Sequence, residues 1–132
     1  MTISMEKMTI GPTAITDPGA VRSELRQALA TISGKWKLEI LWLLNQRVHR
    51  FGELRRAIPG ITQHMLTAQL RELEADGLIS RRIFAEVPPR VDYAMTSAAQ
   101  ALKPVVDAIY GWWTEHGRAA VKEAGGASAR QE

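Results

Sequence analysis

The sequence has 132 residues, a formal net charge of +3, 45% hydrophobic residues and no cysteine. Its length and apolar fraction suit one domain with a single hydrophobic core. The absence of cysteine from this sequence excludes thiol catalysis, thiolate zinc sites, iron–sulfur clusters and disulfide switches. Residues 1–10 lack the apolar segment of a signal peptide and no stretch is as long as a membrane span, so we expect a soluble, cytoplasmic protein.

The positive charge is concentrated in the middle of the chain. Residues 35–90 contain ten Lys or Arg and six Asp or Glu, whereas residues 1–34 contain three of each and residues 91–132 contain four and five. Such an excess suits a polyanionic partner such as nucleic acid, and it is equally consistent with an ordinary solvated surface. Charge alone leaves both interpretations open.

The N-terminal part predicts an arm followed by two helices. Residues 1–16 show no periodicity and are expected to be flexible, with ordering against a partner subunit left open. Asp17 and Pro18 then form a typical helix start, and the first helix ends at Gly34. A second, largely buried helix is predicted over residues 35–46 because its apolar residues gather on one side.

Two further helices are predicted to meet across a tight turn. Residues 51–58 form a short helix that Pro59 and Gly60 end, because proline disfavours helix at the preceding residue and glycine permits the turn. Thr62 is a suitable cap for the next helix, which runs over residues 62–76 and ends at Gly77. Residues 48–50 are long enough only for a turn or a minor strand.

A hairpin and a last helix complete the predicted order. Residues 79–84 and 91–95 are β-branched and aromatic runs that predict an antiparallel hairpin with a proline-stiffened loop. Thr96 caps a long helix through about His116, in which Pro104 either causes a kink or marks the true start. Residues 117–132 are expected to form a flexible tail.

This order is that of a winged helix-turn-helix. The predicted fold class is mainly α with a small β-hairpin wing (α+β), carrying extra N- and C-terminal dimerisation helices. Residues 17–116 form the domain in this interpretation, between the arm and the tail.

The helix over residues 62–76 has a buried stripe and an outward face. Leu66, Leu70 and Leu73 fall within roughly 60° of one another and define the buried stripe. Glutamine can pair with adenine, arginine with guanine or phosphate, and the threonine methyl with the thymine methyl. A polar outward face also occurs on ordinary solvent-exposed helices, but the tight turn before this helix and the hairpin after it favour DNA binding. Its residues are Gln63, His64, Thr67, Ala68 and Arg71.

Basic residues on the hairpin and near it are candidates for contacts with the DNA backbone. The hairpin carries Arg81, Arg82 and Arg90, whose guanidinium groups suit phosphates or the minor groove. Arg90, expected at the tip, is the principal candidate. Taken singly, each is more often a solvated charge than a contact. Basic residues that flank this unit and suit phosphate contacts, which would fix the position of the protein along the DNA, are Lys35, Lys37 and Arg50.

Four segments of the sequence resemble the HxlR-type regulators. They read GKWKLEIL (34–41), RFGELRR (50–56), LTAQLRELEADGLI (66–79) and VPPRVDY (87–93), and the resemblance covers about residues 25–115. It implies a homodimeric winged-helix DNA-binding protein, often acting on nearby genes and often answering aldehydes, quinones or other electrophiles.

Three departures from the family limit what the resemblance implies. Many relatives that sense oxidants carry a cysteine shortly before the Gly-Lys-Trp segment, and this sequence has none. A thiol switch is therefore not carried over. Gln69 and His64 stand where longer basic side chains are common, so we expect both to affect which operator is read.

The predicted terminal helices carry apolar stripes that suit a subunit interface. The stripe of the last helix spans about 140°, which is broader than a one-sided contact requires. A well-buried core helix is the alternative. Four tryptophans (Trp36, Trp42, Trp112 and Trp113) suit the wall of an apolar pocket between subunits, although core packing is their more common role. The predicted dimer interface comprises Val21, Leu25, Leu29, Leu102, Val106, Ile109, Trp112 and Trp113.

The sequence thus predicts a homodimeric transcription regulator that binds a pseudo-palindromic duplex operator, without a cofactor or metal. Residues 62–76 would lie in the major groove and the wing, residues 79–95, on the backbone or minor groove. A small-molecule effector remains open. The alternative is a ligand-sensing or protein-interaction module whose winged helix no longer binds DNA. An enzyme is disfavoured because the three histidines are scattered and no nucleophile, metal-ligand or phosphate-loop motif occurs.

Overall fold

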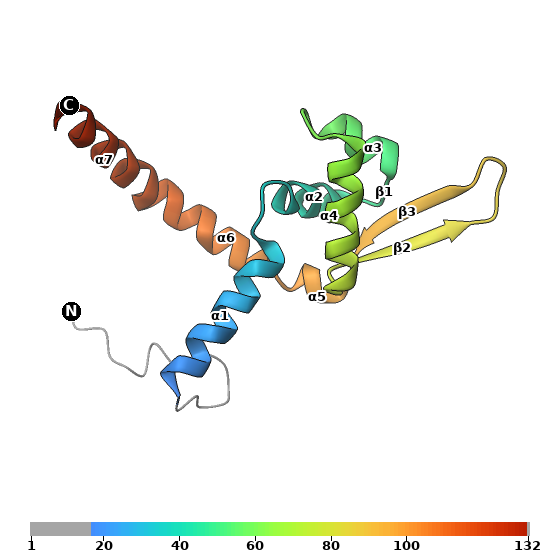
Figure 1. Cartoon of the computed structure of the whole chain (residues 1–132), viewed down its shortest axis with the longest axis horizontal. Coiled ribbons are helices and arrows are strands. Elements are labelled where there is room, and N and C mark those ends of the chain that lie inside the picture. Colours follow the sequence, from blue (N-terminus) through green and yellow to red (C-terminus); the bar gives the residue numbers. More distant parts are fainter. Residues whose placement is uncertain (1–16, 132) are drawn as a thin grey trace.

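The computed structural model describes residues 17–131, so the arm predicted over residues 1–16 lies outside the described residues. The fold is mainly helical with one small sheet, as predicted (Figure 1). The elements are α1 (Pro18–Ile32), α2 (Lys37–Gln46), β1 (His49–Arg50), α3 (Phe51–Ala57), α4 (Gln63–Ala75), β2 (Ile79–Phe84), β3 (Arg90–Met95), α5 (Ser97–Gln100), α6 (Lys103–Trp112), the π-helical turn η2 (Trp113–Gly117) and α7 (Arg118–Gln131).

The sheet has three antiparallel strands in the order β1-β3-β2. The β2–β3 hairpin, here called the wing, extends away from the helices (Figure 1). The short segment predicted as a turn or minor strand is β1, in which buried His49 pairs with Tyr93 of β3. This pairing joins the end of α2 to the base of the wing.

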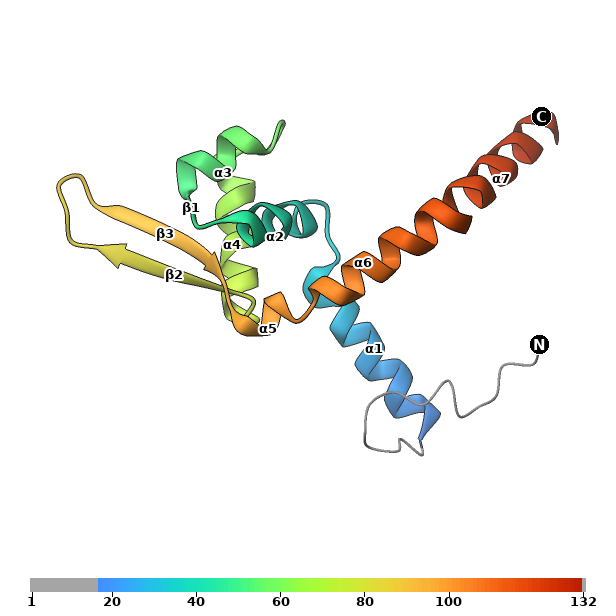
Figure 2. The same ribbon diagram turned by 180° about the vertical axis from the view of Figure 1, so that it is seen from behind.

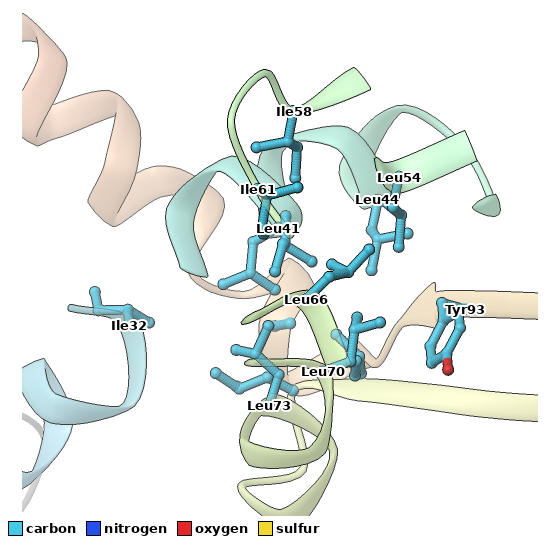
Figure 3. Packing of buried hydrophobic residues seen from close by; sticks show 14 residues of the cluster. Ile32, Leu41, Leu44, Leu54, Ile58, Ile61, Leu66, Leu70, Leu73 and Tyr93 are labelled. Atoms are coloured by element: carbon cyan, nitrogen blue, oxygen red, sulfur yellow. The ribbon is translucent and has the colours of Figure 1, made fainter. Parts of the chain in front are cut away.

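The hydrophobic core lies where α2, α3 and α4 meet the base of the wing (Figure 3). Leu66, Leu70 and Leu73 of α4 are buried, which confirms the stripe predicted from their spacing. They pack with Ile40 of α2 and Leu54 of α3, both fully buried. Close packing of this kind fixes the rotation of α4 about its axis and hence the direction of its opposite face.

The turn between α3 and α4 is set by local hydrogen bonds and one glycine. Gly60 has a φ of +85°, a conformation that residues with a Cβ rarely adopt. Thr62 Oγ1 accepts a hydrogen bond from the backbone N–H of Met65 at 3.1 Å, as expected for an N-cap. Gly77, at φ +76°, closes the other end of α4.

The start of α3 is fixed by a carboxylate. The backbone N–H of Arg50 donates to Glu53 Oε1 at 2.8 Å, and Glu53 Oε2 lies 3.4 Å from the Arg47 guanidinium. The bond from Arg50, with the nearby Arg47, holds the pKa of Glu53 below its ordinary value. These contacts hold the start of α3 next to the end of β1.

The C-terminal part differs from the prediction in two respects. The single helix expected from Thr96 to His116 is wrong: α5 and α6 are separate, and Pro104 stands in the first turn of α6. Proline is tolerated there because that turn has no hydrogen-bonded N–H to lose. The prediction of a flexible tail over residues 117–132 is also wrong in its secondary structure, because helix α7 continues to Gln131. Its Ala, Arg, Lys and Glu residues favour helix enough to offset two glycines.

The terminal helices project from the rest of the chain. Helices α6 and α7, joined by η2, form one long rod, and α1 leaves in another direction (Figures 1 and 2). Here the winged-helix unit means residues 37–100. The terminal helices therefore expose sides that the unit does not cover.

Candidate nucleic-acid interface

The outward face of α4 is accessible to a large partner. The side chains of Gln63, His64 and Arg71 are exposed, and those of Thr67 and Ala68 are half-buried. His64, Thr67, Ala68 and Arg71 point away from the leucine stripe, and Gln63 lies at its flank in the first turn of α4. None of the five belongs to the hydrophobic core. The structure thus brings together residue types that can read base edges.

Gln69 does not belong to this face. Its side-chain oxygen is buried and accepts no hydrogen bond within the described residues, and the side chain lies near Gly34. The expectation that Gln69 affects operator choice is not supported by this placement, because its amide points into the domain. His64, the other departure from the family, is exposed on the outward face.

The three arginines of the wing have different surroundings. Arg81 Nε lies 3.5 Å from Glu74 Oε1 of α4, so part of its charge is neutralised. The Arg82 guanidinium lies over the ring of Phe84, 4.8 Å from its centroid, and makes no ion pair in the described part of the chain. Arg82 is therefore the wing arginine with the most available charge.

Arg90 lies at the distal end of the wing, beside the tip loop, and is built into the hairpin. It is the first residue of β3, opposite Phe84, and its guanidinium lies 3.9 Å from that ring centroid. Its Nη1 is 3.3 Å from Glu86 Oε1, and its Nε is 3.4 Å from Asp92 Oδ1. This position adjoins the predicted tip, but two carboxylates offset the charge that was expected to attract phosphate.

The flanking basic residues also differ from one another in their surroundings. Lys35 is exposed, with Nζ 4.8 Å from the centroid of the Trp36 ring, and Arg50 is exposed beside the start of α3. Lys37, by contrast, is buried and pairs with Glu72 of α4 at 3.1 Å. Lys37 therefore positions α4 and is not available to a phosphate.

Two further arginines were missed by the sequence reasoning. Arg55 and Arg56 of α3 are exposed and line a hollow of about 500 Å³ beside the Pro59-Gly60 turn, together with Gln63 at the start of α4. Arg56 lies over Gly52, where an added Cβ would be 3.3 Å from its guanidinium. A pair of arginines directly before a helix-turn-helix turn was the signal available in the sequence.

The terminal helices leave large apolar side chains in water. On α1, Leu25 and Leu29 are exposed and Val21 is half-buried. On the rod, the exposed side chains include Ile109, Trp112 and Trp113, the two indole centroids being 6.5 Å apart. Leu102 and Val106 are half-buried against the winged-helix unit. Apolar surface gathered on projecting helices is typical of an interaction site.

An outward polar helix beside a hairpin wing defines the class of protein: a winged helix-turn-helix transcription regulator. Residues 31–120 match the HxlR-like helix-turn-helix family. The chain belongs to this family.

Curated relatives support this assignment. The chain is 47% identical over 90 residues to an HTH-type transcriptional regulator of Methanothermobacter thermautotrophicus, covering 68% of this chain and 69% of the relative. It is 46% identical over 88 residues to the HTH-type transcriptional regulator YtcD of Bacillus subtilis, covering 67% and 70%. These relatives are transcription regulators and not enzymes.

Solved structures resemble most of the fold. A regulator of the MarR family from Enterococcus faecalis has a TM-score of 0.73 at 39% identity, covering 85% of this chain and 99% of the other. The reduced form of the redox regulator HypR has a TM-score of 0.69 at 40% identity, covering 76% and 98%. Among residues 17–131, no helix is both long and apolar enough to cross a membrane.

Proposed function

We propose that the protein acts as a homodimer that binds a pseudo-palindromic duplex operator in a sequence-specific manner. The observation that carries this proposal is the orientation of α4, here called the recognition helix. Its leucine stripe is buried and its position is fixed by the Lys37–Glu72 pair, so its polar face points outward. A rigidly held polar helix face is what reading in the major groove requires.

In this proposal base edges and phosphates are contacted by different groups. The recognition helix reads bases through Gln63, Thr67 and Arg71, with His64 beside them and small Ala68 permitting close approach. The wing lies on the backbone or in the minor groove. Phosphate contacts come from Lys35, Arg50, Arg81 and Arg82, to which the structure leads us to add Arg55 and Arg56, whereas Arg90 holds the wing together.

The dimer is proposed from the terminal helices. Exposed Leu25 and Leu29 of α1, and Ile109 and Trp112 of α6, give two projecting helices apolar sides that water would otherwise cover. A second copy would bury these sides by a two-fold arrangement, and the two recognition helices would then meet two half-sites of one operator.

We further propose that the signal controlling DNA binding does not act through a thiol of this chain. The sequence contains no cysteine, although one of the similar solved structures is a redox regulator. The effector we propose is a small molecule bound without thiol chemistry. The proposed location is the cytoplasm, where the DNA is.

The test is binding to duplexes selected from a random pool, followed by fluorescence anisotropy at several salt concentrations. The chain should select a two-fold related sequence, and affinity should fall steeply with salt because phosphate contacts release counterions. Arg71→Ala on the recognition helix should weaken binding, whereas Arg118→Ala on exposed α7 should not. No enrichment, with weak salt-insensitive binding, would instead favour a module that no longer binds DNA.

A further inference from the structure

A cavity of about 630 Å³ lies between the winged-helix unit and the start of the α6 rod. Its walls come from the end of α1, from α2, α3, β3 and α5, and from the first two turns of α6. The lining is mainly apolar and includes Leu43, Met95, Leu102 and Val106. A volume of this size lies in the usual range for small-molecule sites.

One wall of this cavity is an incompletely covered aromatic surface. Trp42 and Leu38 of α2 line the cavity and are 62% and 48% exposed, respectively. Of the four tryptophans, only Trp42 lines this cavity. An indole on one wall with aliphatic side chains around it suits a flat aromatic ring, whose binding would remove apolar area from water.

The polar groups of the cavity set the charge of the ligand that fits. They are Glu39, Asn45, Lys103 and Asp107. Lys103 Nζ pairs with Asp107 Oδ2 at 2.8 Å, so these two charges offset each other. Glu39 has no ion pair within residues 17–131, and the lining therefore carries a net charge of about −1. A carboxylate would be repelled, while a cation would be attracted by Glu39 and by the face of Trp42.

The two sides of α6 separate this cavity from the proposed subunit interface. Leu102 and Val106 face the cavity, whereas Val105, Ile109 and Trp112 are exposed and do not line it. At 100° per residue the latter three fall on one stripe, and Lys103 and Asp107 lie well away from it. A second copy on that stripe would leave the cavity open to a ligand.

We propose that this cavity binds a small aromatic molecule carrying an uncharged polar group or a cation, and that it discriminates against carboxylates. The effect of ligand binding on DNA affinity rests on the proposed function. Helix α2 lines the cavity through Leu38 and Trp42 and holds the recognition helix through Lys37 and Glu72. Occupancy of the cavity therefore changes the affinity for the operator.

The test uses three probes that share one ring system: naphthylmethanol, naphthylmethylammonium and naphthoate. Isothermal titration of the full chain without DNA should give one site per chain for the alcohol and the ammonium. Naphthoate should bind at least roughly tenfold more weakly. Glu39→Gln should reduce the preference for the ammonium over the alcohol. If the full chain binds none of the three, or binds all three equally, the proposal is overturned.

Two substitutions in the cavity lining and one control test where the probes bind. Val106→Trp should fill the cavity and abolish binding, while Tyr110→Trp, one turn further along α6 and outside both the cavity lining and the interface stripe, should bind as the parent does. Trp42→Ala removes an exposed side chain and so keeps the fold, and it should weaken all three probes. Binding that persists unchanged in both Val106→Trp and Trp42→Ala would put the probes elsewhere and overturn the assignment.

The outcomes also separate this proposal from the DNA-binding function. Probe binding is measured without DNA, and operator binding is measured without probe, so either can fail while the other holds. An intact dimer that binds no probe, together with a monomeric Trp112→Glu variant that does bind it, would assign the cavity to a segment of the second copy and would overturn the ligand proposal.

Discussion

Lys37 Nζ lies 3.1 Å from Glu72 Oε1 and joins α2 to the recognition helix. The two partners differ in their surroundings, because the Lys37 side chain is 7% exposed and that of Glu72 is 55% exposed. Loss of the lysine leaves a carboxylate that water can solvate. Loss of the carboxylate leaves a buried ammonium without its partner.

Glu72→Ala should therefore destabilise the fold by about 1–3 kcal/mol in urea denaturation, because an unpaired buried charge remains. Adding Lys37→Met should recover part of this loss, since the apolar side chain no longer needs a partner. A double variant less stable than Glu72→Ala alone would show that the buried lysine contributes through packing and not through the pair.

The two wing arginines should respond differently to substitution. Arg82→Ala should weaken binding to every duplex and reduce the slope of log affinity against log salt by about 0.9 for each subunit, or about 1.8 for the dimer. Arg90→Ala should lower protection of the hairpin amides in hydrogen exchange, because Arg90 holds Phe84, Glu86 and Asp92 together.

Lysine substitutions at Arg82 and Arg90 provide the control for the two alanine variants. Arg82→Lys should retain most of the binding if charge alone matters, whereas Arg90→Lys should still loosen the wing because lysine lacks a planar group to lie on Phe84. An unchanged hairpin in Arg90→Lys, with a reduced salt dependence in Arg90→Ala, would return Arg90 to the role of a phosphate contact.

The proposed dimer can be tested on the exposed stripe of α6. Trp112 is 57% exposed, so Trp112→Glu adds a charge without opening the core of the chain. A charge inside an apolar interface is costly, and sedimentation should therefore show monomers. Val87→Glu, on the fully exposed loop of the wing, adds the same charge and should remain dimeric. A dimeric Trp112→Glu variant would place the contact elsewhere.

The parts of the fold that follow from local pattern were predictable. The leucine period of the recognition helix, the Pro59-Gly60 turn and the Thr62 cap each have a local cause, and each predicted the correct element. The contact of Arg90 with the Phe84 ring depends on the register of the hairpin, and the burial of Lys37 depends on a helix 35 positions away along the chain, at Glu72. Spacing along the sequence does not report either contact.

Gly117 gives the sharpest test of the terminal rod. It is buried in η2, and a Cβ there would lie 2.6 Å from both Trp112 Cζ3 and Trp113 Cε3, so the indoles cover the glycine. Gly117→Ala should displace these rings, destabilise the chain by about 1–3 kcal/mol and shift its tryptophan emission. Gly111→Ala is the matched control, because its Cβ would meet nothing within 4 Å and alanine favours helix by about 0.5–1 kcal/mol. If thermal unfolding shows both variants equally stabilised, the indoles do not pack on Gly117.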